Sequence, residues 1–395
     1  MLNILPIHPF PARMAPEIAL NEINTLPTSA TILDPMMGSG TVLRVAIENN
    51  RRAIGRDMDP LAILMSSVWT TPVDSEAVKC VAETVVAQAQ ELKDEEIYIP
   101  WIDDDLETEQ FIDFWFSEPQ VKSLRRLVYA ISTSTNNQAI MNALRLGVSR
   151  IIVTKDRGAS LARDTSHSRP HRVALINDYD VMAGFLQSIN RIAQRLSFSP
   201  DSINCDVALG DARSLASIPN SSVDAVITSP PYLNAIDYMR GHRLALVWLG
   251  YRLSDLRQIR STTIGVERAI DKDADLNFAQ QILTHIDAEH QLPKREANMV
   301  KRYIVDLHAM ISEIKRVLKP SGRAVLVVGN SNIRGVFVSN ANAVSKIAEH
   351  IGLEFVSNNE RELPPNKRYL PPPTKQGKSN LTKRMRTESV LTFIR

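Results

Sequence analysis

The chain has 395 residues, 44% of them apolar and 23% charged, which is an ordinary balance for one large or two smaller folded domains. Its net charge of +2 is not strongly basic, so any affinity for nucleic acid must come from local patches. Two isolated cysteines, Cys80 and Cys205, exclude the usual zinc-cluster spacings and suit a reducing cytoplasm, so no metal is expected. No N-terminal signal pattern is present and no apolar run approaches the roughly 18 residues of a membrane span, so no membrane partner is expected either.

The first informative segment is the loop 34–41, Asp-Pro-Met-Met-Gly-Ser-Gly-Thr. It follows the apolar run 30–33, which predicts a buried strand, and open α/β sheets bind ligands at the carboxyl ends of their strands. Gly38 and Gly40 allow positive φ angles and close approach of a ligand to the backbone, and a helix is expected from about Thr41. A phosphate-binding P-loop is disfavoured because no Lys-Ser or Lys-Thr pair follows, and Gly-Ser-Gly differs from the dinucleotide pattern. For the loop taken alone, an ordinary strand-to-helix turn remains the alternative.

A second strand is predicted over 52–57, and it ends in Asp57. An acidic residue at this place in a β-α-β unit commonly holds two ribose hydroxyls. The glycine loop and the acid together therefore predict a site for a ribose-containing cofactor at the edge of the sheet.

Residues 71–202 match no motif and are predicted to form a mainly helical insert. Apolar residues at helical spacing predict helices over about 74–97 and 119–132. They are separated by an acidic stretch at 103–109 that we interpret as a solvated linker, with a metal site as the alternative. The segment 150–172 is basic and suits contacts with DNA phosphates and guanine edges, with a solvated surface loop as the alternative. The candidates for DNA contact in this segment are Arg150, Lys155, Arg157, Arg163 and Arg169.

The second informative segment, Thr-Ser-Pro-Pro-Tyr at 228–232, follows the apolar run 223–227, which also predicts a buried strand. Its prolines fix φ and lack an amide hydrogen, so the backbone carbonyls around them are free to accept hydrogen bonds. Such a turn can present Ser229 and the carbonyl of Pro230 to an amino group, with the ring of Tyr232 stacked on a planar base. A proline turn that only ends a strand is the alternative.

The remainder of the chain is predicted to contain a helix over 235–251, which begins near the candidate site, and an amphipathic helix over 298–318. Between them, residues 252–298 are charged and weakly periodic, and we expect a segment that is either mobile or target-facing. The stretch 366–386 carries several basic residues and no acidic one, which makes it a second candidate for contact with the DNA backbone. A solvated hairpin is the alternative there. The candidate residues are Lys375, Lys378 and Lys383.

The combination of the glycine loop with Thr-Ser-Pro-Pro-Tyr resembles the S-adenosylmethionine-dependent DNA methyltransferases that modify exocyclic amino groups. This resemblance implies an α/β fold, namely a Rossmann-like class I methyltransferase sheet with helices on both faces, in which the last strand (388–394) runs antiparallel. It implies that residues 1–70 and 203–395 form the two parts of the methyltransferase domain. The helical insert at 71–202 would then help to recognise the target.

The resemblance also implies roles for individual residues. His8 and Pro11 would belong to a motif that encloses the methionine part of the cofactor, and Asp57 would bind the ribose hydroxyls. Asp211, at the end of another strand, would bond the adenine amino group. The complete set of implied cofactor residues is His8, Pro11, Asp34, Pro35, Gly38, Ser39, Gly40, Thr41, Asp57, Asp211 and Thr228. The implied catalytic residues, which would hold the target base, are Ser229, Pro230, Pro231 and Tyr232.

The expected function is methylation of an amino group in DNA with S-adenosylmethionine. Serine in Ser-Pro-Pro-Tyr is more typical of cytosine-N4 enzymes within the family, so cytosine N4 is favoured and adenine N6 is the alternative. Methylation of guanine N2 in transfer RNA, methylation of a protein glutamine, and a non-enzymatic subunit that only recognises DNA are further alternatives. The expected partners are DNA and a cognate restriction endonuclease or defence-system protein.

Overall fold

The structure is a computed structural model. It describes residues 5–9, 13–154, 157–163, 171–173, 176–196, 205–233, 237–264, 273–286, 292–363 and 387–395.

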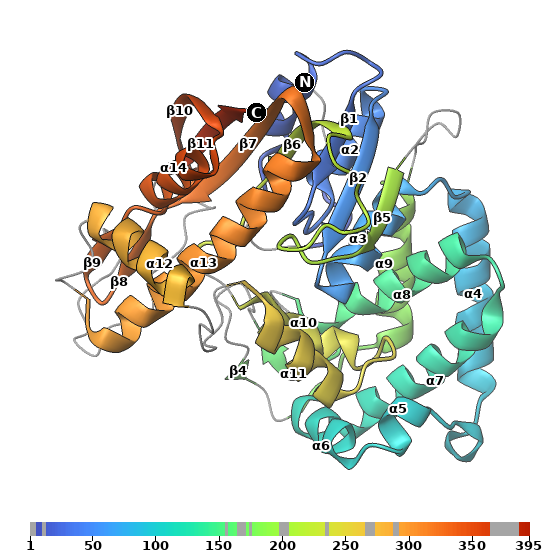
Figure 1. Cartoon of the computed structure of the whole chain (residues 1–395). Coiled ribbons are helices and arrows are strands. Elements are labelled where there is room, and N and C mark those ends of the chain that lie inside the picture. Colours follow the sequence, from blue (N-terminus) through green and yellow to red (C-terminus); the bar gives the residue numbers. More distant parts are fainter. Residues whose placement is uncertain are drawn as a thin grey trace.

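A seven-stranded sheet forms the centre of the molecule, in the order β10-β11-β7-β6-β1-β2-β5 (Figure 1). Strands β5, β2, β1, β6 and β7 are parallel, whereas β11 is antiparallel to both of its neighbours, β7 and β10. The antiparallel last strand is therefore confirmed. The strands of this sheet are β1 (Thr31–Asp34), β2 (Arg52–Asp57), β5 (Cys205–Leu209), β6 (Val223–Thr228), β7 (Leu318–Gly329), β10 (Glu354–Glu362) and β11 (Thr387–Ile394).

Helices cover both faces of the sheet, because side chains that alternate along a strand point to opposite faces and both sets are apolar here. Ile32 of β1 and Ile227 of β6 pack under α1 and α2, while their neighbours Leu33 and Val226 pack under α13 and α14. The predicted Rossmann-like class I methyltransferase fold, with helices on both faces, is confirmed. The helices concerned are α1 (Pro16–Ile23), α2 (Thr41–Glu48), α3 (Pro60–Thr70), α12 (Asp273–His285), α13 (Lys294–Val317) and α14 (Asn340–Ile351).

The order of the strands reverses between β1 and β6. From β1 the chain proceeds to β2 and then β5, whereas β6 leads to β7 on the other side. Open α/β sheets form their binding crevices at such a switch point, outside the carboxyl ends of the strands. The two motifs singled out in the sequence follow β1 and β6, so both lie at this point. A hairpin of β8 (Ser331–Ile333) and β9 (Val336–Val338) follows β7 at the same edge.

The insert is mainly helical, as predicted, and lies beside β2 and β5 in Figure 1. Beyond its helices, the described residues of the insert include a short 3-10 helix (Asp94–Glu96) and the paired strands β3 (Ala162–Arg163) and β4 (His171–Arg172). Its helices are α4 (Ser75–Glu91), α5 (Pro100–Asp103), α6 (Leu106–Trp115), α7 (Glu118–Ser134), α8 (Gln138–Ile152) and α9 (Val181–Ala193).

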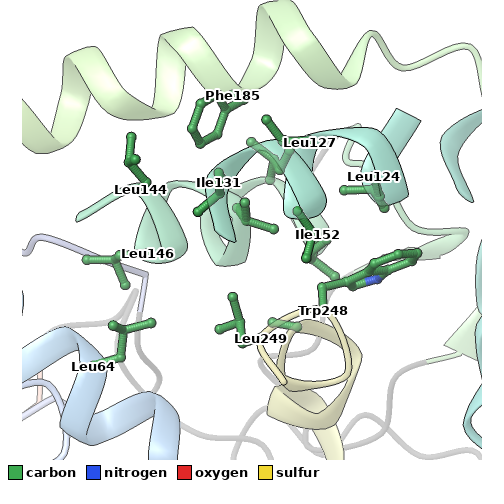
Figure 2. Packing of buried hydrophobic residues seen from close by; sticks show 14 of the residues in the cluster. Leu64, Leu124, Leu127, Ile131, Leu144, Leu146, Ile152, Phe185, Trp248 and Leu249 are labelled. Atoms are coloured by element: carbon green, nitrogen blue, oxygen red, sulfur yellow. The ribbon is translucent and has the colours of Figure 1, made fainter. Parts of the chain in front are cut away.

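The insert shares one hydrophobic core with α3 and with α10 and the residues that follow it. Figure 2 shows Leu127, Leu144 and Phe185 of the insert packed around Leu64 of α3 and Trp248, which follows α10. A hydrogen bond reinforces this packing, because the indole nitrogen of Trp101 donates to the Val247 carbonyl at 2.9 Å. Residues 229–232 are called the catalytic turn here, after the role that the resemblance implies. The helices that follow this turn are α10 (Tyr238–Leu246) and α11 (Leu253–Thr262).

The interpretation of the acidic stretch 103–109 as a linker is wrong. It forms the end of α5 and the first turns of α6. Asp103 is fixed there, because its carboxylate accepts a hydrogen bond from the Ile99 amide at 2.6 Å and pairs with Arg125 of α7 at 2.7 Å. Partners from another helix thus turn an acidic stretch into ordered structure.

Candidate active site

One cavity lies at the carboxyl ends of the parallel strands and is lined by the segments that follow β1, β2, β5 and β6. It brings together the glycine loop, Asp57 and the turn 229–232, although the turn lies far from the other two in the sequence. The predicted residues on its lining are Asp34, Pro35, Gly38, Ser39, Thr41, Asp57, Asp211, Ser229, Pro230, Pro231 and Tyr232. Sequence reasoning did not assign other lining residues to the site, among them Arg13, Met14, Met36, Met37, Asp59 and Ile264. Asp237 and Tyr238 also line the cavity, as expected for a helix that begins near the site.

The glycine loop is fastened to β2 and α3. The amide of Gly38 donates to Oδ2 of Asp57 at 2.9 Å, and the Ser66 hydroxyl donates to the Gly38 carbonyl at 3.1 Å. Gly38 and Gly40 have φ angles of 49° and 80°. At position 40 a Cβ would also lie 2.7 Å from Oγ of Ser66, so both the backbone angle and the packing require glycine.

Asp57 keeps hydrogen-bonding capacity toward the cavity. Its Oδ2 accepts from Gly38 and its Oδ1 accepts from the Asp59 amide at 2.9 Å, so each oxygen retains a lone pair for a further donor. Burial raises its pKa to about 6, with the nearby charge of Asp59 adding to the shift. This arrangement suits two neighbouring hydroxyl donors.

Asp59 links the acidic turn to the helix that follows the catalytic turn. Its Oδ1 accepts from the Leu61 amide at 2.9 Å and so caps the start of α3. Its Oδ2 is hydrogen-bonded to Nδ1 of His242 on α10. The Asp-x-Asp-Pro spacing at 57–60 is the signal that could have drawn attention to this second acid.

Asp34 is buried at the end of β1, with 3% of its surface exposed. Its Oδ1 accepts from the Thr228 hydroxyl at 2.7 Å and from the Met36 amide at 3.2 Å. Burial raises its pKa to about 7, and the charge of Asp57 adds to the shift. Thr228 is fully buried behind the cavity, where it supports the position of Ser229.

The turn 229–232 is held by hydrogen bonds to and from several elements, and none of them uses the carbonyl of Pro230. The Ser229 hydroxyl donates to the Val327 carbonyl of β7 at 3.1 Å, and the Tyr303 hydroxyl donates to the Pro231 carbonyl at 3.0 Å. Ser331 donates to the carbonyl of Leu233 at 2.7 Å. Among the residues that the structure describes, none donates to the carbonyl of Pro230, which borders the cavity.

Two residues behind the turn were not expected from the sequence. Tyr303 is buried in α13, and burial raises its pKa far above the usual range, so it remains a hydroxyl donor. Glu388 of β11 is also buried, and its Oε2 lies 3.5 Å from the Tyr232 hydroxyl while Arg361 pairs with its other oxygen at 3.3 Å. Neither residue lies in a recognisable motif.

Asp211 lines the cavity near β5 and holds an arginine. Nε of Arg213 lies 3.0 Å from its Oδ1, and Nη2 lies 2.7 Å from its Oδ2. The other terminal nitrogen of Arg213 donates to Asp306 of α13 at 2.7 Å. Asp211 is therefore fixed in position by a bidentate pair, a strong and directional contact.

His8 is placed differently from its expected role. His8 lies outside the cavity lining, because its Nε2 is 3.0 Å from the Ser149 hydroxyl on α8 and its Nδ1 is 2.7 Å from the Pro9 carbonyl. Burial, with the charge of Arg150 nearby, lowers the pKa of His8 to about 3, so the ring is neutral. Pro11 lies outside the described residues.

The candidates for DNA contact are only partly described. Arg150 donates to the carbonyl of Ile7, so its guanidinium holds the N-terminal segment against α8. Arg157 is exposed and pairs with Asp178 at 3.2 Å. The backbone of Arg163 forms part of β3. The remaining candidates, Lys155, Arg169, Lys375, Lys378 and Lys383, lie outside the described residues, and their role stays a prediction.

Two features of the described residues concern other classes of site. They contain no group of three or more histidine, cysteine, aspartate or glutamate side chains placed to hold a metal ion. No helix in this part of the chain combines the length and the apolar character that crossing a membrane requires.

Comparison with known proteins gives relatives of one kind. The chain is 24% identical to the Type II methyltransferase M.MvaI of Kocuria varians over 407 aligned positions, which cover 94% of this chain and 86% of that protein. It is 27% identical to the Type II methyltransferase M.AvaI of Nostoc sp. over 217 positions, which cover 50% of this chain and 43% of that protein. A third relative, the Type II methyltransferase M.BsoBI of Geobacillus stearothermophilus, is 28% identical over 35% of this chain and 33% of its own length.

No family model matches the chain. Among solved structures, a SAM-dependent methyltransferase from Methanosarcina mazei covers 97% of this chain at 10% identity, with a TM-score of 0.33. That similarity is too low to support an argument about the site.

Proposed function

We propose that the protein is a DNA methyltransferase that transfers a methyl group from S-adenosylmethionine to the exocyclic amino group of a base. The observation that carries this proposal is that the glycine loop with Asp57 and the catalytic turn 229–232 line the same cavity. The similarity to M.MvaI along 94% of the chain supports it. The expected partners, by the family resemblance, are DNA and a cognate restriction endonuclease or defence-system protein in the cytoplasm.

The residues of the cavity fit S-adenosylmethionine. Asp57 offers two free lone pairs for the ribose hydroxyls, and the buried carboxylates of Asp34 and Asp57 favour a cationic ligand. Met36 and Met37 provide apolar lining beside them. When bound, the cofactor supplies a methyl group on a positively charged sulfur. Asp211, fixed by Arg213, would border its adenine.

The catalytic turn can make an aromatic amino group more nucleophilic. The lone pair of such a nitrogen is delocalised into the ring, so the group needs help to become tetrahedral. The hydroxyl hydrogen of Ser229 is directed to Val327, which leaves its oxygen lone pairs as acceptors, and the carbonyl of Pro230 is also unused. Both can accept amino hydrogens, so catalysis would rest mainly on positioning and electrostatic support.

Tyr232 would stack on the target base. An amino group inside a duplex is out of reach, so the base must be turned out of the helix into the site. Tyr232 lines the cavity, and its hydroxyl lies 3.5 Å from buried Glu388, which would limit the movement of the ring. Aromatic stacking of this kind accepts any base, so the choice of target must come from other contacts.

Cytosine N4 is the favoured target, because a serine at position 229 resembles the cytosine-N4 enzymes more than the adenine-N6 enzymes. Nucleoside mass spectrometry tests both the proposed methylation of DNA and the choice of cytosine N4 as the target. Purified protein and S-adenosylmethionine are incubated with unmethylated genomic DNA and, separately, with unmodified transfer RNA, and the Tyr232→Ala variant serves as the control.

N4-methylcytosine in the DNA is the expected product. N6-methyladenine would keep the enzyme class and overturn the cytosine assignment. Methylguanosine in the RNA alone would replace DNA by RNA as the substrate. Absence of any product despite bound cofactor would point to a protein substrate or to a subunit that only recognises DNA.

A further inference from the structure

Three arginines beside the start of α10 have guanidinium groups without an anionic partner in the described part of the chain. Arg240 and Arg243 belong to α10, and Arg172 belongs to β4. Within the described residues, none of the three guanidinium groups forms a hydrogen bond or an ion pair. Nε of Arg243 is buried, but its two terminal nitrogens and the guanidinium of Arg240 reach solvent. We call these three residues the arginine patch.

Two phenylalanines of α6 hold two members of the patch in place. The guanidinium carbon of Arg243 lies 5.1 Å from the centre of the Phe111 ring, and that of Arg172 lies 5.4 Å from the centre of the Phe114 ring. Both rings contact the buried Trp115, with ring centres 6.2 and 5.1 Å away. Residues three apart are neighbours on a helix, so the two cations also lie close together. A cation–π contact positions a guanidinium without engaging an anion, so its N–H donors can still bind one.

The positive charges in this region affect one another. The pKa of Arg243 is lowered by its partial burial and then by the charges of Arg240 and Arg260, while the charge of Asp237 offsets only part of the effect. Asp237 itself is paired with Arg260 at 2.7 Å. An anionic ligand at the patch would therefore reduce both the repulsion and the cost of burial.

The patch lies next to the cavity. Asp237, Tyr238 and Met239 line the cavity, and Arg240 is the next residue of α10. Because an α-helix rises 1.5 Å per residue, Arg243 lies about 9 Å along the axis from Asp237. One strand of DNA carries a phosphate every 3.4 Å or so along its axis. Phosphates within about two or three nucleotides of a base held in the cavity would therefore meet the patch.

We propose that Arg172, Arg240 and Arg243 bind backbone phosphates of DNA beside the target base, an inference that rests on the proposed function. Guanidinium groups match phosphate with parallel hydrogen bonds, and phosphate contacts fix the position of DNA without reading its sequence. The proposal assigns this contact to α10 and the adjoining edge of the insert. Arg150 and Arg157, which were candidates from the sequence, already have partners within the chain.

Fluorescence anisotropy with a short labelled DNA duplex of arbitrary sequence tests this inference without measuring turnover. Affinity is measured at several KCl concentrations in the presence of S-adenosylhomocysteine. The double variant Arg172→Gln/Arg240→Gln removes two charges, and Arg172→Lys/Arg240→Lys keeps them. Arg243→Gln is tested alone, and the control is Arg52→Gln, at an exposed position at the amino end of β2. Thermal unfolding verifies that each variant is folded.

The double glutamine variant is expected to reduce the slope of log K against log [KCl] by about 2, and Arg243→Gln by about 1, because each lost phosphate contact removes about 0.9. At about 0.1 M KCl the double variant should bind about 10- to 100-fold more weakly. The lysine variant and Arg52→Gln should keep the slope of wild type.

An unchanged slope in the glutamine variants would overturn the inference alone, even if affinity fell, since the loss would then be structural. An equally large loss of slope in Arg52→Gln would also overturn it, because any surface charge would have the same effect. Failure of wild type to bind the duplex at any salt concentration would overturn the proposed function as well.

Discussion

Asp34 and Thr228, which lie far apart in the chain, share a buried hydrogen bond of 2.7 Å that joins the ends of β1 and β6. These strands flank the point where the order of the sheet reverses. Asp34 opens the glycine loop, and Thr228 immediately precedes Ser229. The hydrogen bond therefore sets the position of the glycine loop relative to the catalytic turn.

Thr228→Val should test this connection, because valine keeps the shape of threonine and removes the hydroxyl. The Oδ1 atom of Asp34 would lose a donor in a buried environment, which should lower the free energy of unfolding by about 1–3 kcal/mol. Urea unfolding measures this change, and single-turnover kinetics should show slower transfer. Thr228→Ser, which keeps the hydroxyl, is the control, and equal stability of the two variants would contradict the role of the bond.

The pKa values of the buried carboxylates predict an effect of pH on stability. Burial raises the pKa of Asp34 to about 7 and that of Asp57 to about 6, above the ordinary value of 3.8. The folded state therefore holds protons that the unfolded state releases, and these groups reduce stability as pH rises from about 4 to about 7. Buried His8 acts in the opposite direction as pH falls, so variants must be compared with wild type at each pH.

Asp34→Asn should isolate that effect in the protein without ligand. Asparagine still offers an oxygen to Thr228 but cannot be charged, so the variant should gain stability relative to wild type between pH 5 and pH 8, by up to about 4 kcal/mol. Thermal unfolding at several pH values measures the difference. The control is Asp113→Asn, an exposed position on α6. A difference from wild type that does not grow with pH would show that Asp34 is not held in the strained, charged form.

Tyr303→Phe removes the donor to the Pro231 carbonyl and preserves the ring. A partly buried carbonyl left without its partner should cost about 1 kcal/mol of stability, and the turn should lose rigidity. We therefore expect a lower turnover rate with little change in affinity for S-adenosylhomocysteine. Stopped-flow methyl transfer and calorimetry separate the two quantities. Normal turnover in this variant would mean that the bond from Tyr303 is not needed to position the turn.

Tyr232→Ala should lose most turnover while keeping cofactor affinity, because stacking is worth about 1–3 kcal/mol per base. Tyr232→Phe keeps the ring and removes the hydroxyl that lies 3.5 Å from Glu388, so its loss should be smaller. Methyl transfer to DNA under single-turnover conditions measures both. Near-normal transfer by the alanine variant would rule out stacking by Tyr232.

The sequence was sufficient to predict the parts of the site that directly follow strands. The glycine loop, Asp57 and the catalytic turn each come after an apolar run, and parallel strands bring their carboxyl ends to one edge. Tyr303 could not be found in this way, because it occupies a core-facing position of an amphipathic helix and its partner is a backbone carbonyl. Glu388 lies 156 residues after Tyr232, in a different strand and outside any motif, so its contact with the turn could not be predicted either.

The sequence also could not predict the contact that Arg150 makes. In the sequence it is the first member of a basic segment, which suggests a surface in contact with DNA. In the structure its guanidinium donates to the carbonyl of Ile7. A carbonyl acceptor carries no sequence signature, so composition alone could not distinguish an arginine that pairs internally from one that is free to bind phosphate.

The core shared by the insert, α3 and the residues after α10 has a consequence for engineering. Exchanging residues 71–202 for the corresponding region of another methyltransferase would place foreign side chains against Leu64, Trp248 and Leu249. A chimera with a new target preference should therefore also carry the donor's residues at 64 and 244–249. Without them, the transplanted region would meet a surface shaped for a different partner.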